Sequence, residues 1–168
     1  IVSKHTSPCG AATGTAIEEG YVRAREADPL SAFGGIVGVN RRIDVDTARA
    51  LTATFIEAVI APEIDDEARA ILATKQNMRV VTTDFKKAFE PIMGQPPSDM
   101  RSFLGGLLMQ EPDRVTEARE SWPQRDFPRV VTGRQPTAAE WTGLRLAWRV
   151  CAHVKSNTIV FSSAERTL

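Results

Sequence analysis

The sequence predicts a layered α/β domain, an α/β/α arrangement built on a mixed, largely parallel sheet. Short apolar runs rich in β-branched residues, such as residues 36–39 and 56–61, alternate with segments whose apolar residues recur at helical spacing, such as residues 11–27. Glycine and proline clusters separate these segments. The expected element order is β, α, β, α, β, α, β, β, α, β, and such alternation is typical of helices packed against a sheet.

The composition excludes several classes of partner. The 168 residues include 21 basic and 21 acidic side chains, so no net charge attracts nucleic acid or an acidic membrane surface. No stretch of about 18 apolar residues is present, and we expect no membrane span. Cys9 and Cys151 are too few for a disulfide framework and no signal peptide precedes them, so we expect a cytoplasmic protein. The chain starts without methionine inside a predicted strand, so we expect it to be a piece of a longer polypeptide.

The first predicted strand ends in a pair of titratable side chains, Lys4 and His5. Ser7 followed by Pro8 has the form of a helix N-cap with proline at the first helical position, so we expect a strand-to-helix junction here. Open α/β sheets bind ligands at the carboxyl ends of strands beside helix N-termini, and histidine can transfer protons near neutral pH. Successive strand residues point to opposite faces, however, so a solvated strand end is the alternative interpretation of the pair.

Two further features have both a functional and a structural interpretation. Asp28 and the proline after it end the first helix, and the paired Gly34 and Gly35 then precede the next strand. These glycines either let the backbone approach a ligand closely or form a plain loop. Glu57 lies within the otherwise apolar strand 56–61, so it either faces water at a sheet edge or is kept for a ligand.

Capping residues predict two more helices. Asp44 can cap a helix that turns Ala48, Leu51 and Phe55 inward. Thr137 begins a capping box that closes three residues later. The helix that it opens is expected to direct one face into the core, formed by Trp141, Leu144, Trp148 and Cys151. The remaining expected elements are a helix at 65–73, a strand at 79–82, a loop at 95–98, a strand at 100–110 interrupted at Gly105-Gly106, an irregular stretch at 111–128, and a strand at 158–161 after the polar cluster 155–157.

Short motifs of several enzyme classes are absent from the sequence. A zinc deaminase requires Pro-Cys-x-x-Cys together with His-x-Glu, yet Ala12 stands at the second cysteine position after Cys9, and Ser7 stands where the glutamate belongs. The signatures of P-loop nucleotide triphosphatases, serine hydrolases and zinc proteases are also missing. Spacing alone therefore leaves a small-molecule site of undefined chemistry.

Five ordered motifs point to a family. They are residues 4–10 (Lys-His-Thr-Ser-Pro-Cys-Gly), 28–35 (Asp-Pro-Leu-Ser-Ala-Phe-Gly-Gly), 57–62 (Glu-Ala-Val-Ile-Ala-Pro), 101–106 (Arg-Ser-Phe-Leu-Gly-Gly) and 154–157 (Val-Lys-Ser-Asn). In this order and spacing the sequence resembles the transformylase half of AICAR transformylase/IMP cyclohydrolase over nearly all 168 residues. The resemblance implies that residues 1–168 are part of the transformylase domain, without the cyclohydrolase domain and the C-terminal part of the transformylase.

The resemblance implies transfer of a formyl group from 10-formyltetrahydrofolate to the 5-amino group of AICAR in IMP biosynthesis, in a parent chain that also has IMP cyclohydrolase activity. That amine is a poor nucleophile, so its attack requires a base. By resemblance His5 is this base or a proton shuttle, Lys4 tunes or positions it, and Asn157 hydrogen-bonds the reacting region. The implied substrate-binding residues are Ser31, Phe33 and Gly34, of which Phe33 and Gly34 would line the ribotide pocket, and Glu57 at the position that contacts the pterin.

The resemblance also implies a cytidine-deaminase-like fold without zinc and a homodimer with shared active sites, and potassium is a candidate monovalent cation. The family often has asparagine where Ser7 stands, and serine can cap the same helix. Because the downstream segment that completes the substrate site is missing, an alternative function is a catalytically incomplete ligand-binding or assembly module of the same α/β type. An unrelated α/β ligand-binding domain is a third hypothesis.

Overall fold

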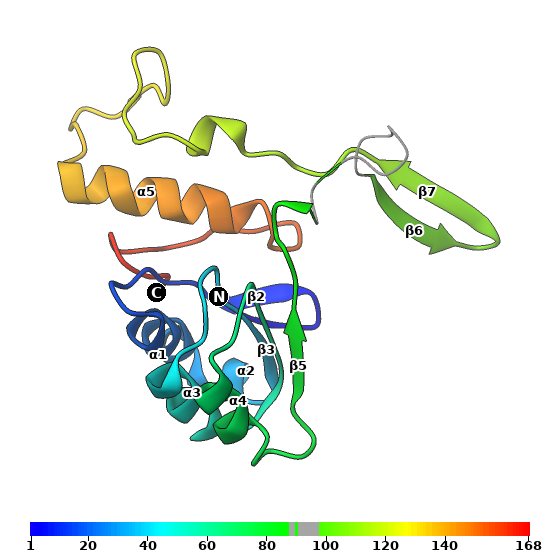
Figure 1. Ribbon diagram of the computed structural model, residues 1–168. Helices are drawn as coiled ribbons and strands as arrows, with labels where there is room; N and C mark the ends of the chain where they lie inside the picture. The colour runs from blue at the N-terminus through cyan, green and yellow to red at the C-terminus, as the bar shows by residue number, and fades with distance from the viewer. Residues whose placement is uncertain (88–89, 91–97) are drawn as a thin grey trace.

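The computed structural model describes residues 1–87, 90 and 98–168, and it confirms the α/β class. Its main sheet consists of β1 (Val2–Lys4), β2 (Ser7–Gly10), β3 (Gly35–Gly38), β4 (Ile56–Ala61) and β5 (Arg79–Thr82), in the order β2-β1-β3-β4-β5 (Figure 1). Strand β1 pairs antiparallel with β2 and β3, whereas β3, β4 and β5 run parallel. The sheet is therefore mixed, with its parallel part at the β3–β5 side.

Three helices gather along one side of this sheet, namely α1 (Ile17–Ala27), α3 (Val45–Thr52) and α4 (Asp66–Leu72) (Figure 1). A single short helix, α2 (Pro29–Ala32), joins α1 to β3. The largest fully buried hydrophobic side chains of the core come from the strands, the helices and the loop after β3: Val2, Val37, Ile43, Leu51, Val59 and Leu72. Burial of these apolar side chains is the main favourable contribution to folding.

The second half of the chain is more open. The hairpin of β6 (Asp99–Phe103) and β7 (Gly106–Gln110) projects away from the main sheet (Figure 1). A 3₁₀ turn at Thr116–Ala118 leads toward α5 (Ala138–Cys151), and the C-terminal segment runs between α5 and α1 (Figure 1). None of the helices in the described part of the chain has the length and apolar character that crossing a membrane requires.

Several elements have the predicted positions and caps. Strands β4 and β5 have the predicted bounds. Asp44 caps α3 by accepting a hydrogen bond from the backbone amide of Thr47 at 2.9 Å, and Thr137 and Glu140 form the predicted capping box of α5. Of the side chains expected to face inward, the structure buries Ala48, Leu51 and Trp141.

The predicted core positions at Phe55, Leu144 and Trp148 are wrong. Phe55 follows the end of α3 instead of lying on its inner face, and it is 48% exposed. On α5, Leu144 and Trp148 remain half-exposed. Trp148 instead packs edge-on against Trp122 and Phe127 of the irregular segment, with ring centroids 5.9 and 6.0 Å away.

Two predicted strands also differ from the structure. Residues 100–110 form a hairpin because Leu104 and Gly105 both take positive φ, 43° and 82°, and make a two-residue turn. Residues 158–161 form no ladder with any described strand, and the chain there leads to an isolated bridge between Ser162 and Thr167. Residues 95–97 of the loop predicted at 95–98 lie outside the described residues.

Candidate functional site

The site begins at the turn between β1 and β2, which replaces the predicted strand-to-helix junction. Lys4 pairs with Ser7, so His5 and Thr6 are the two central turn residues, with φ of 51° and 66°. Positive φ at both positions is the pattern of a type I′ turn, which suits a tight hairpin. Ser7 therefore does not cap a helix, and Pro8 lies in β2, an edge strand, where a residue without an amide hydrogen is tolerated.

The turn removes the geometric objection to the Lys4–His5 pair. Because His5 has left the regular strand, the alternation of side chains along β1 no longer separates it from Lys4. Both residues line one open cavity of about 500 Å³, and His5 is exposed. The cavity is lined by Lys4, His5, Ser7, Pro8, Cys9, Asp28, Leu30 and Ser31.

Lys4 connects this cavity to the segment around Phe33. Its Nζ donates a hydrogen bond to the carbonyl oxygen of Phe33 at 2.8 Å. The Phe33 ring is 63% exposed and lies 5.2 Å, centroid to centroid, from the ring of Phe55. Gly34 takes a φ of 68° and donates its amide to the carbonyl of Phe55 at 2.9 Å. Glycine is suited to this position because the left-handed region is costly for residues with a Cβ.

The site lies at the amino ends of the parallel strands, not at their carboxyl ends as predicted. Lys4 ends β1, and β1 runs antiparallel to β3, so Lys4 meets the residues just before β3. Glu57, the second residue of β4, lies near this same edge. It forms an ion pair with Arg79 of β5 at 2.8 Å, in which the Glu57 side chain is 47% and the Arg79 side chain 70% exposed, and it does not line the cavity.

The segment after α5 approaches the turn from the far end of the sequence. Lys155 Nζ donates a hydrogen bond to the carbonyl oxygen of His5 at 3.1 Å. Asn157 is two residues further along the chain and is exposed. The structure thus brings Lys4, His5 and Ser31 into one cavity lining, attaches Phe33 and Gly34 through Lys4, and brings the segment that carries Asn157 to the back of the turn.

Asp28 and Cys9 are cavity residues that sequence reasoning did not assign to the site. Asp28 caps α2 by accepting a hydrogen bond from the Ser31 amide at 3.0 Å, and hydrogen bonds from Ser31 hold the pKa of its carboxyl below the usual value. Burial raises the pKa of the Cys9 thiol, and the nearby Asp28 carboxylate raises it further, against an opposing effect of Lys4. At neutral pH the cavity therefore contains a carboxylate and a protonated thiol.

Asp28 could have been found from a local signal. An aspartate followed by proline and then by serine three residues later is a helix N-terminus pattern, with proline at the first helical position. The prediction from Asp28 and the proline after it concerned only the end of the preceding helix. No cluster of three or more histidine, cysteine, aspartate or glutamate side chains that could hold a metal ion occurs among residues 1–87, 90 and 98–168.

Comparisons with known proteins extend over the whole chain. The sequence profile of the AICARFT/IMPCHase bienzyme family matches residues 1–168. The chain is 45% identical over 167 residues to a protein of Nostoc punctiforme described as "Bifunctional purine biosynthesis protein PurH", an alignment that covers 99% of this chain and 30% of that protein. It is 44% identical to proteins of the same description from Anaeromyxobacter dehalogenans and Myxococcus xanthus, with 100% of this chain covering 32% and 31% of them. The chain thus spans about a third of the length of these curated relatives.

Proposed function

Since the chain belongs to the AICARFT/IMPCHase bienzyme family, we propose that it is part of the transformylase domain of a bifunctional purine biosynthesis enzyme. The intact parent transfers a formyl group from 10-formyltetrahydrofolate to the 5-amino group of AICAR, and it also has IMP cyclohydrolase activity. Residues 1–168 supply one part of the formyl-transfer site. The cavity beside the β1–β2 turn, lined by Lys4, His5 and Ser31, is the observation that carries this proposal.

His5 is the proposed base or proton shuttle. Its ring stands on a turn that is held from two sides, because Lys4 bonds to the Phe33 carbonyl and Lys155 bonds to the carbonyl of His5 itself. These bonds fix the backbone that carries the imidazole, and an imidazole placed there can accept a proton from the weakly nucleophilic amine as it attacks the formyl carbon. The Lys4 ammonium lies in the same lining, where it can position an anionic or carbonyl group of a substrate.

The proposed substrate contacts lie around this turn. Phe33 offers an exposed ring, Gly34 offers a backbone without a side chain, and Ser31 contributes to the cavity lining. Asn157 is the proposed hydrogen-bonding residue for the reacting region. Glu57 is proposed to contact the pterin of the folate, and its exposed ion pair with Arg79 leaves its carboxylate accessible from solvent.

The remaining proposals concern the parent protein. It is a cytoplasmic homodimer with shared active sites and a cytidine-deaminase-like transformylase fold that uses no zinc. The exposed apolar side chains of the β6–β7 hairpin support an interface at that hairpin. Potassium is the proposed monovalent cation, and no step of the reaction is assigned to it.

Substitution of His5 in the parent enzyme tests the proposed base. His5→Gln keeps a polar side chain but cannot accept a proton near neutral pH, and we expect formyl transfer to fall by about a hundredfold or more. The measurement is the steady-state rate of formyl-AICAR formation. His153→Gln is the matched control because His153 is the second of the two histidines and does not line this cavity. Circular dichroism and thermal unfolding report whether the variants are folded, and cyclohydrolase turnover, which belongs to another domain, should be unchanged. A His5 variant within about threefold of the wild-type rate contradicts the proposed role.

The second candidate function is a ligand-binding or assembly module without turnover. It is favoured by the open form of the cavity, which residues 1–87, 90 and 98–168 do not enclose. Formyl transfer is to be assayed with the 168-residue chain and with its parent under the same conditions. Activity in both supports an autonomous catalytic unit, whereas activity in the parent alone supports the module.

A further inference from the structure

The C-terminal residues 162–168 form a hooked segment that is hydrogen-bonded to the residues just before α1. We call residues 162–168 the hook. An isolated bridge joins Ala12 to Arg166, and Thr13 donates its amide to the carbonyl of Glu165 at 2.7 Å. Thr167 lies only 7% exposed, its amide donates to the carbonyl of Ala11 at 2.9 Å, and its hydroxyl accepts from the amide of Ala11 at 3.0 Å. The hook therefore has a buried polar anchor.

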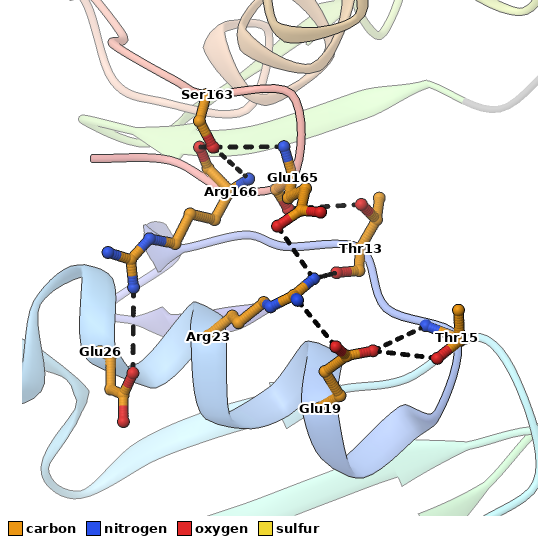
Figure 2. Close-up of polar contacts among 8 residues, drawn as sticks. All are labelled: Thr13, Thr15, Glu19, Arg23, Glu26, Ser163, Glu165 and Arg166. Atoms are coloured by element: carbon orange, nitrogen blue, oxygen red, sulfur yellow. Dashed lines mark hydrogen bonds and ion pairs between the residues drawn. The ribbon is translucent and has the colours of Figure 1, made fainter. Parts of the chain in front are cut away.

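A second set of contacts surrounds Arg23 on α1, as Figure 2 shows. Its guanidinium pairs with Glu165 at 3.2 Å and with Glu19 at 2.7 Å, and it donates to the carbonyl of Thr13 at 3.2 Å. Arg23 thus connects the hook, the strand-like segment before α1 and α1 itself (Figure 2). The Arg23 side chain is 30% exposed and that of Glu165 is 61% exposed, so each ion pair contributes little by itself.

The hook also holds the helix above it. Ser162 donates its hydroxyl to the carbonyl of Gly143, in the middle of α5, at 2.7 Å. A Cβ added at Gly143 would lie 2.9 Å from the carbonyl oxygen of Ser163, so glycine is required for this close approach of hook and helix. One short segment is therefore bonded to α1 on one side and to α5 on the other.

Residues 152–161 connect α5 to the hook, and they carry Lys155 and Asn157. Both ends of this connecting segment are fixed, one by α5 and one by the hook, and in its middle Lys155 bonds to the carbonyl of His5. Fixing both ends reduces the number of conformations open to the ten residues between them. The position of the segment that carries Lys155 and Asn157, and with it the bond from Lys155 to the His5 turn, thus depends on contacts that lie outside the cavity.

We propose that Thr167, supported by Arg23, is a positioning residue that holds the Lys155–Asn157 segment against the His5 turn. This inference rests on the proposed function, because it gives the segment a part in formyl transfer. We expect Thr167 to contribute more than Arg23 to holding the hook in place. The Thr167 hydroxyl is buried and bonded to a buried backbone amide, whereas the contacts of Arg23 are partly solvated.

The test uses Thr167→Val in the parent enzyme, which keeps the shape of the side chain and removes the hydroxyl. Thr167→Ser, which keeps the hydroxyl, is the matched control. Two quantities are measured: amide hydrogen exchange of residues 153–160, and kcat and KM for formyl transfer. In the valine variant we expect exchange of these residues to rise about tenfold and kcat to fall about tenfold, with cyclohydrolase turnover unchanged and the serine variant close to wild type.

If exchange of residues 153–160 is unchanged in the valine variant, the hook does not position them and the proposal is wrong. If exchange rises while kcat stays at the wild-type value, the hook is structural only and the proposal is also wrong. Should the valine variant fail to fold, Arg23→Glu/Glu19→Gln is compared with Arg23→Glu/Glu19→Gln/Glu165→Arg, because Glu19 would otherwise repel the new glutamate. Recovery of slow exchange and of kcat in the triple variant supports the proposal, and no recovery overturns it. A wild-type parent without formyl transfer refutes the proposed function, whereas exchange still reports on the hook.

Discussion

Gly10 is required because the backbone of α1 passes directly over it. A Cβ at this position would overlap the carbonyl oxygen of Ala24 and would lie 3.0 Å from the Cβ of Ala27. Since main-chain atoms cannot move aside as a flexible side chain can, we expect Gly10→Ala to destabilise the chain by about 1–3 kcal/mol. The measurement is the free energy of unfolding from denaturant titration followed by tryptophan fluorescence.

Gly20→Ala is the matched control for this substitution. Gly20 lies within α1, and the nearest heavy atom to an added Cβ is 3.6 Å away, an ordinary contact. Alanine favours the helix over glycine, so this variant should gain about 0.5–1 kcal/mol. If both substitutions changed the free energy of unfolding equally, the close approach of α1 to Gly10 would not be the reason that position 10 requires glycine.

Residue-level reasoning brought Lys4 and His5 together but did not predict the backbone that presents them. Both side chains line one cavity, and their role in ligand binding and catalysis stays a prediction. The expected helix cap at Ser7 was wrong because the fixed φ of Pro8 suits both the first turn of a helix and an edge strand. The choice between them is made by the pairing of β2 with β1, which no local pattern of residues reveals.

At the scale of elements, the start of α5 is held by a cap that resists acid. Arg134 bonds to both carboxylate oxygens of Glu140 at 2.8 Å, and Glu140 in turn accepts a hydrogen bond from the amide of Thr137 at 2.7 Å. These contacts, with the Arg134 hydrogen bonds the largest cause, lower the pKa of Glu140 to about 2. The carboxylate form thus persists in mildly acidic solution.

The pH dependence of this cap follows from the sign of the shift. Because the pKa of Glu140 is lower in the folded state than the ordinary 4.5, its stabilising effect is complete above pH 4.5 and is lost as the pH falls toward about 2. We expect the Thr137 amide resonance to follow this transition in an NMR titration. Arg134→Gln should move the midpoint up toward 4.5, and an unchanged midpoint would contradict the role of Arg134.

Elements with strong local signals could be predicted from the sequence, and elements defined by pairing could not. Helices α3 and α5 have side-chain caps, β4 is an apolar run that ends at a proline, and β5 contains two adjacent β-branched valines, so these four were correctly placed. The β6–β7 hairpin was missed because Leu104 takes the first positive φ of its turn, and leucine gives no signal for that conformation. Residues 158–161 have strand propensity, but they pair with no described strand, and propensity without a pairing partner does not produce a strand.

At the scale of the whole molecule, the projecting β6–β7 hairpin exposes a dense group of apolar side chains. Its strands expose Met100, Phe103, Leu107, Leu108 and Met109 by 54–63%, and Leu104 at the turn is 92% exposed. An isolated two-stranded hairpin is marginally stable in water, and apolar side chains in such density are typical of interfaces. In the proposed homodimer, the same apolar hairpin region of the second subunit covers this surface.

Substitution on one face of the hairpin tests this assignment. Met100 pairs with Met109 and Ser102 pairs with Leu107, so Leu107 and Met109 share a face. In the parent enzyme we expect Leu107→Lys/Met109→Lys to shift the dimer toward monomer in sedimentation experiments, because a buried interface would have to accept two unpaired charges. Val131→Lys, at a residue that is 79% exposed outside the hairpin, should leave the dimer intact. A double variant that remains dimeric would show that this face of the hairpin is not the dimer interface.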